Sequence, residues 1–192
     1  EVLQVEHDGT RIVQLSDEAI IDRMGTVPLP PYIHGPLEDA GRYQTVYARA
    51  EGSVAAPTAG LHFTDDLLDA VRAVGAETVF VTLHVGWDSF RPVRDENPSS
   101  HRMHSEWWEL SPEAANVINR AKQSGRRVIS VGTTAVRLLE QTAALYARRP
   151  SLDLGDGLVI ADGSGWANLF ILPGHRFRVV DALLTNFHLP RS

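Results

Sequence analysis

The chain contains no cysteine, and this absence removes several kinds of chemistry at once. Without cysteine there is no disulfide framework, no thiolate nucleophile and no cysteine-ligated zinc. No apolar run approaches the roughly 20 residues that a membrane-spanning helix needs, and no stretch resembles a secretion signal. We therefore expect a cytoplasmic protein of bacterial type, with no membrane partner.

Positive charge is also scarce. The 18 basic residues are outnumbered by 24 acidic ones, which gives a net charge of −6. An acidic surface argues mildly against a nucleic-acid partner, because phosphates are neutralised by basic side chains. Charged residues make up only 22% of the 192 residues and hydrophobic ones 43%. We therefore expect one good core, or a core with a small appendage, and not a disordered chain.

Residues 1–27 predict a small β-rich part. Alternating residues flank Asp8-Gly9, a dipeptide that favours a type I′ hairpin turn. The proline-rich stretch at 28–31 enforces extended backbone. We interpret it as the boundary between this β-rich part and an α/β domain over residues 28–192.

From residue 53 onward, strand-like and helix-like patterns alternate. This alternation predicts an α/β fold with a mixed or parallel sheet and helices packed beside it. The glycine-rich stretch 154–165 is expected to be a mobile loop. Helices are expected over 65–74 and 112–124, capped by Thr64 and Ser111, and within 132–149. Strands are expected over 77–85, 126–131, 167–172 and 176–184.

The stretch "SVAAPTAGLHFTDDLL", residues 53–68, combines a strand exit with tiny residues and two rings. Small residues let a ligand approach the backbone closely, while His62 and Phe63 offer a polar contact and a stacking face. In parallel α/β structures, ligands meet the carboxyl ends of strands. Since "HVGWDSF" and "VGTT" follow other expected strands, we expect these loops to share one pocket.

The segment "HRMHSEWW" holds His101, His104 and Glu106. Imidazole and carboxylate groups form catalytic zinc sites, but the HExxH pattern is absent. We rank general acid–base catalysis or hydrogen bonding above metal binding for these residues. Surface histidines without a functional role are an equally good interpretation. Trp107-Trp108 could form a stacking platform, although one of the two is better explained as core.

Thr133, Thr134 and Arg137 lie at the expected start of a helix. Backbone N–H groups, hydroxyls and a guanidinium there could bind an anion, although a threonine cap beside a solvated arginine is slightly favoured. The GxxxxGK[ST] pattern is absent, and the glycines over 155–165 fit neither a dinucleotide site nor an EF-hand. Asn186 could read an adenine edge or be a turn residue.

In chain order, several blocks closely resemble the S-adenosylmethionine:tRNA ribosyltransferase-isomerase family of queuosine biosynthesis. The blocks are "LPPYI" (29–33), "RYQTVYA" (42–48), "AAPTAGLHF" (55–63), "TLHVG" (82–86), "FRPV" (90–93), "HRMHSE" (101–106), "VGTT" (131–134) and "TNFHLP" (185–190). The resemblance implies transfer and isomerisation of the ribosyl group of S-adenosylmethionine onto 7-aminomethyl-7-deazaguanine in tRNA, which yields epoxyqueuosine.

The resemblance also implies S-adenosylmethionine as co-substrate, tRNA as partner and no metal or redox cofactor. We also expect a monomer. The family fold is an α/β domain carrying an inserted β-barrel, so residues 1–27 would be the tail of that insertion and 28–192 an α/β domain incomplete at both ends. Acid–base roles are then expected for His104, Glu106, His84 and His188. Substrate contacts are expected for Arg42, Tyr43, Gln44, Thr58, His62, Phe63, Thr133, Thr134, Arg137 and Asn186.

One departure keeps other functions open. Where the family pattern reads "HVGxGTF", this chain has Asp88 in place of a glycine and Trp87 before it. An added carboxylate changes which charged groups a pocket accepts. The alternatives are a paralogue with a different acceptor, a non-catalytic nucleoside- or RNA-binding module, and a metal-dependent hydrolase built on His101, His104 and Glu106.

Overall fold

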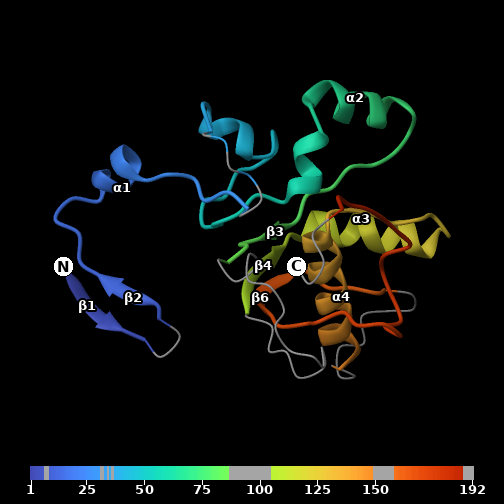
Figure 1. Ribbon diagram of the computed structural model, residues 1–192. Helices are drawn as coiled ribbons and strands as arrows, with labels where there is room; N and C mark the ends of the chain where they lie inside the picture. The colour runs from blue at the N-terminus through green and yellow to red at the C-terminus, as the bar shows by residue number, and fades with distance from the viewer. Residues whose placement is uncertain are drawn as a thin grey trace.

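The computed structural model describes residues 1–6, 9–30, 33, 35, 37–86, 105–148 and 158–187. The described parts form a mixed α/β structure with three small sheets. The chain runs from an N-terminal arm, residues 1–30, into a larger body in which helices pack beside short strands (Figure 1). A mixed α/β fold was expected; the sheets are smaller and their strands shorter than predicted.

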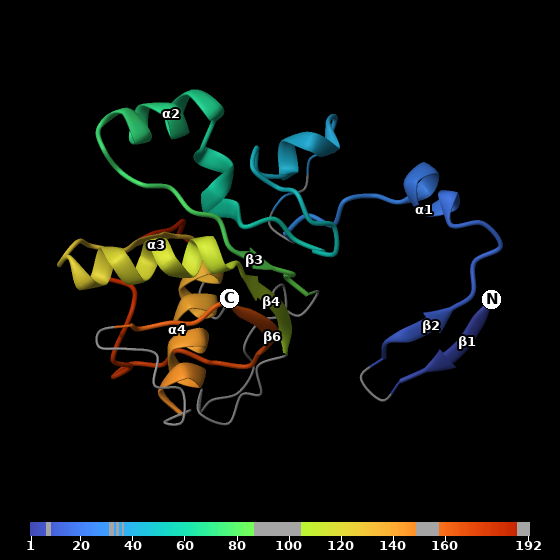
Figure 2. The ribbon, with the colours of Figure 1, turned by 180° about the vertical axis from the view of Figure 1, so that it is seen from behind.

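The N-terminal arm consists of a hairpin and one short helix. Strands β1 (Val2–Val5) and β2 (Arg11–Val13) pair antiparallel, and Gly9 takes the positive φ of 89° that a tight turn needs. The hairpin is therefore confirmed. Helix α1 spans Ala19–Met24. Figures 1 and 2 both show the arm lying to one side of the body; the domain boundary at residue 27 stays a prediction.

The main sheet is antiparallel, which corrects the expectation of a parallel arrangement. Strands β3 (Thr82–Leu83), β4 (Glu106–Leu110) and β6 (Gly163–Ala167) pair in the order β3-β4-β6, both pairs antiparallel. The parallel geometry occurs only between β5 (Ile129–Val131) and β7 (Ala182–Leu184), among the described strands.

Strand β6 begins in the glycine-rich stretch 154–165 that we expected to be a loop. The ring of Trp108 covers Gly165, where an added Cβ would lie 3.5 Å from the ring. Small residues on β6 thus leave room for a large buried aromatic on β4. The predicted strand over 167–172 is wrong apart from Ala167, the last residue of β6.

The three helices of the body lie where the sequence predicts them. In α2 (Asp65–Ala73), the Thr64 hydroxyl accepts a hydrogen bond from the Leu67 N–H at 3.1 Å. In α3 (Pro112–Gln123), Ser111 caps the Ala114 N–H in the same way. Helix α4 spans Thr133–Ala147. Two 3-10 helices, η1 (Ala40–Tyr43) and η2 (Thr58–His62), complete the described helical elements.

The core lies where α3 and α4 meet the sheets. Its fully buried aliphatic residues include Leu110 from β4, Leu138 from α4, Ile160 and Val179. A buried carboxylate on α4 secures the last of these: Glu140 accepts hydrogen bonds from the backbone N–H groups of residues 178–180 at 2.9–3.0 Å. Among the described helices, none has the length and apolar character needed to cross a membrane.

Candidate functional site

Three segments that are distant in the sequence meet at one place in the body. The ring of His62, at the end of η2, lies 3.0 Å (Nε2 to Oδ1) from Asn186, which follows β7. The N–H of Gly132, just before α4, donates to the carbonyl of Leu184 at 2.8 Å, and a Cβ on Gly132 would lie 3.9 Å from that of Ala59. We call η2, residues 132–134 and residues 184–186 the η2–α4 cluster.

The position of η2 depends on a glycine. A Cβ on Gly60 would collide with the hydroxyl of Tyr47 and would lie 2.8 Å from the methyl group of Thr45. Only glycine permits this close packing between η2 and the "RYQTVYA" block. Burial raises the pKa of the Tyr47 hydroxyl, and its ring packs on Phe80 with centroids 4.9 Å apart.

The start of α4 offers backbone N–H groups to a ligand. Its N-cap is Gly132, at a φ of 86°, and no described side chain caps the helix. Thr133 is exposed and Thr134 half-buried. The threonine-cap interpretation is therefore wrong. The first N–H groups of this 15-residue helix have no partner within the helix and carry partial positive charge, which is the arrangement that binds carboxylates and phosphates.

Glu106 and Arg137 form a buried ion pair beside this cluster. The guanidinium also donates to the carbonyls of Leu169 (3.0 Å) and Ala167 (2.9 Å), and the carboxylate accepts the N–H of Gly86 at 3.1 Å. Burial lowers the pKa of the Arg137 guanidinium, an effect that Glu106 opposes. The solvated-arginine interpretation is therefore wrong. These contacts support a structural role for the ion pair, which holds α4 to β4 and to the backbone at Gly86.

His84 packs closely against the backbone at Gly52. Gly52 has a φ of 132°, and a Cβ there would lie 2.7 Å from the His84 Nδ1 atom. That nitrogen is buried and has no hydrogen-bond partner among the described residues. Residues 53–54 run beside β3, since the Val54 N–H donates to the carbonyl of Val85 at 2.9 Å. Residues 52–62 therefore connect His84 with the η2–α4 cluster.

The remaining expected site residues that the structure describes lie in η1, directly after it, or at the ends of η2. Arg42 is exposed at the end of η1, Tyr43 is buried, and the Gln44 side chain accepts the N–H of Thr45 at 2.9 Å. Thr58 and Phe63 are half-buried at either end of η2. Five of the residues that we considered lie outside the described residues: Trp87, Asp88, His101, His104 and His188.

Two features of the site were missed in the sequence. The role of Gly132 as N-cap could have been found, because a glycine between a strand and a helix often takes a positive φ. The Glu106–Arg137 pair joins residues 31 apart, and nothing in the local pattern indicates it. Of the two adjacent tryptophans, Trp108 belongs to the core, and Trp107 packs edge-on against Trp166 with centroids 5.6 Å apart.

Comparisons with known proteins agree with the family resemblance. Residues 1–192 match the family described as "Queuosine biosynthesis protein". A relative from Dehalococcoides mccartyi strain CBDB1, named S-adenosylmethionine:tRNA ribosyltransferase-isomerase, is 52% identical over the whole chain. The protein of the same name from strain BAV1 is 50% identical. The chain spans 53% of the length of each relative.

A solved structure of an S-adenosylmethionine tRNA ribosyltransferase from Thermotoga maritima is 34% identical, with a TM-score of 0.48. The match covers 70% of this chain and 38% of that one. The match to the family over the full 192 residues decides the assignment. This chain belongs to the queuosine biosynthesis protein family.

Proposed function

We propose that the chain carries part of the active site of an S-adenosylmethionine-dependent tRNA ribosyltransferase-isomerase, and that the η2–α4 cluster binds S-adenosylmethionine. The observation that carries the proposal is the meeting of His62, Asn186 and the uncapped start of α4. The names of the relatives support the reaction type. They are about twice as long as this chain, so the proposal concerns the share of the site that this chain provides.

The two ends of the co-substrate would meet different groups. The methionine carboxylate is an anion and fits the N–H groups and hydroxyls at Thr133 and Thr134. The adenine presents a donor and an acceptor that the Asn186 amide and the His62 ring can match. Phe63, half-buried next to His62, offers a face on which a base could stack.

The chemistry needs groups that exchange protons near neutral pH. A base must take the proton beside the sulfonium, the departing adenine needs a proton or hydrogen bonds, and the attacking amine must be neutral. Histidines suit these steps, and we propose His84, His104 and His188 for them. For Glu106, the contacts with Arg137 and Gly86 support a positioning role.

Adenine release from S-adenosylmethionine, with and without tRNA carrying the deazaguanine base, tests the proposal. We expect Asn186→Ala to weaken S-adenosylmethionine binding about tenfold, since a hydrogen bond to a buried ligand contributes about 1 kcal/mol or more. Asn116→Ala is the control, because Asn116 is exposed on α3. Equal binding by Asn186→Ala and the wild-type protein would remove the cluster from the site.

A non-catalytic nucleoside-binding module is the second candidate. It is favoured by the engagement of Glu106 with Arg137, which leaves the described part of the site better equipped to bind than to transfer protons. Saturable binding of S-adenosylmethionine with no adenine release, even with modified tRNA present, would establish this function and reject transferase activity for this chain.

A further inference from the structure

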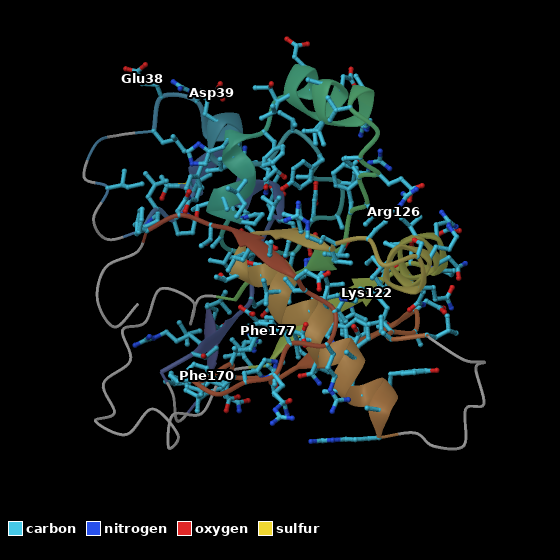
Figure 3. All side chains as sticks on the ribbon, turned by 90° about the vertical axis from the view of Figure 1, so that its right-hand side faces the viewer. Glu38, Asp39, Lys122, Arg126, Phe170 and Phe177 are labelled. Atoms are coloured by element: carbon cyan, nitrogen blue, oxygen red, sulfur yellow. The ribbon has the colours of Figure 1, made fainter. Side chains whose placement is uncertain are left out.

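The C-terminal end of α3 is basic, in contrast to the acidic chain as a whole. Four of the 18 basic residues fall within residues 120–127, although the net charge is −6. We call Arg120, Lys122, Arg126 and Arg127 the basic end of α3. Figure 3 faces this end of the molecule and shows Lys122 and Arg126 beside the coil of α3, seen nearly end-on. The two arginines after the helix are exposed.

A hollow of about 400 Å³ opens at this end. Arg120 and Arg126 line it together with the polar side chains of Gln123 and Ser124, while Glu77 from the loop after α2 contributes an acid. The Arg120–Glu77 pair is loose, at 3.8 Å, and both side chains are more than half exposed. A solvated pair of this kind contributes little, so Arg120 can exchange Glu77 for another anion at low cost.

The remaining charges leave the surface positive. Lys122 pairs with Asp181 at 2.8 Å, and this pairing, with smaller help from Arg127, lowers the pKa of Asp181. Arg126 makes no ion pair within the described part of the chain. The two acidic residues that pair with this end, Glu77 and Asp181, are thus outnumbered by its four basic residues. Basic residues in the last turn also stabilise a helix through its dipole, but Arg126 and Arg127 follow Gly125, after the helix has ended.

We propose that the basic end of α3 binds the sugar–phosphate backbone of the tRNA substrate. A guanidinium matches a phosphate with two parallel hydrogen bonds, and the hollow gives room for one backbone unit between Arg120 and Arg126. The far end of α3 extends away from η2 and the start of α4 (Figure 1), so the contacted phosphates lie apart from the reacting base. The identity of the RNA rests on the proposed function; the phosphate contact rests on the charge distribution.

A salt titration of tRNA binding by the full 192-residue chain tests the inference, with a fluorescently labelled, unmodified tRNA transcript as probe. We expect Arg126→Glu with Arg127→Glu to weaken binding at least tenfold and to reduce the slope of log affinity against log salt by about 1–2. The control is Arg148→Glu with Arg176→Glu. It makes the same charge change at exposed positions elsewhere in the body, and we expect it to stay within about threefold of wild type, with the slope unchanged.

A second variant guards against a folding defect. Arg126→Gln with Arg127→Gln removes charge without reversing it, and we expect an intermediate loss of affinity at an unchanged melting temperature. If both variants bind tRNA like the wild type, or if the control loses as much affinity as they do, the inference is overturned. It is also overturned if the wild type does not bind tRNA at low salt. Adenine release by the wild type is a separate readout. If the wild type binds tRNA normally but releases no adenine, the proposed function is rejected, while the phosphate contact at the basic end of α3 is still supported.

Discussion

The N-terminal arm and the body both contain large apolar residues, but the fully buried ones among the described residues belong to the body. Eight large apolar residues of the arm are 40% to 75% exposed, whereas Leu110, Leu138, Ile160 and Val179 in the body are 0% to 1% exposed. The arm is held by a local turn and a short hydrogen-bond ladder. An isolated two-stranded hairpin is only marginally stable in water. The difference therefore teaches that a local sequence pattern is enough to define a strand or helix, while burial of its apolar side chains makes it stable.

The largest expected effect comes from one isoleucine in each region. Ile118 on α3 is 3% exposed and Ile21 on α1 is 58% exposed. Ile118→Ala removes buried methyl groups and leaves a cavity, so we expect the free energy of unfolding to fall by about 3 kcal/mol. Ile21→Ala should change it by less than about 0.5 kcal/mol. Urea unfolding followed by circular dichroism measures both. Similar losses for the two variants would show that the arm packs as tightly as the body.

The sequence predicts the elements of both regions better than their assembly. The caps at Thr64 and Ser111 and the turn at Gly9 are local features, so a local pattern is enough to find them. The antiparallel order β3-β4-β6 depends on pairing between segments far apart in the chain. The glycines of β6 made this strand look like a loop in the sequence, whereas in the fold they leave room for the Trp108 ring.

The candidate site shows the same division. The structure brings His62 and Asn186 into contact and places the start of α4 beside residue 184, while their common role in a binding site stays a prediction. The burial of Arg137 against Glu106 was not predictable, since a guanidinium at a helix start is usually solvated. Its partner, Glu106, lies on β4. Of its two carbonyl acceptors, Ala167 ends β6 and Leu169 follows it. Only the folded chain brings these groups together.

An intermediate effect is expected from two asparagines on one helix. The Asn119 amide donates to the carbonyl of Ile160 and accepts the N–H groups of Val159 and Ile160, at 2.9–3.2 Å. Asn119→Ala would leave these backbone groups without partners, two of them in a buried residue, and we expect a loss of about 2 kcal/mol. Asn116 is exposed, and Asn116→Ala should cost less than about 0.5 kcal/mol. Equal unfolding midpoints for the two variants would show that residues 159–160 are held by other contacts.

The smallest effect concerns one ion pair in each region. Asp181 in the body pairs with Lys122 at 2.8 Å, and Asp17 in the arm pairs with Arg23 at 2.9 Å, where both side chains are more exposed. The hydrogen bonds from Lys122 and from the Val128 N–H lower the pKa of Asp181 in the folded chain. A lowered carboxyl pKa stabilises the fold above the unfolded value, about 3.9, and this stabilisation is lost as the pH falls through the folded value.

We therefore expect the melting temperature of the wild type to fall below about pH 4 more steeply than that of Asp181→Asn. At neutral pH the variant should be less stable by about 0.5 kcal/mol, the size typical of a solvent-screened pair. Asp17→Asn should follow the wild-type pH curve throughout, because unfolding of the body does not depend on a contact confined to the arm. A shifted curve for Asp17→Asn would mean that the arm unfolds together with the body, and the contrast between the two regions would then be one of exposure only.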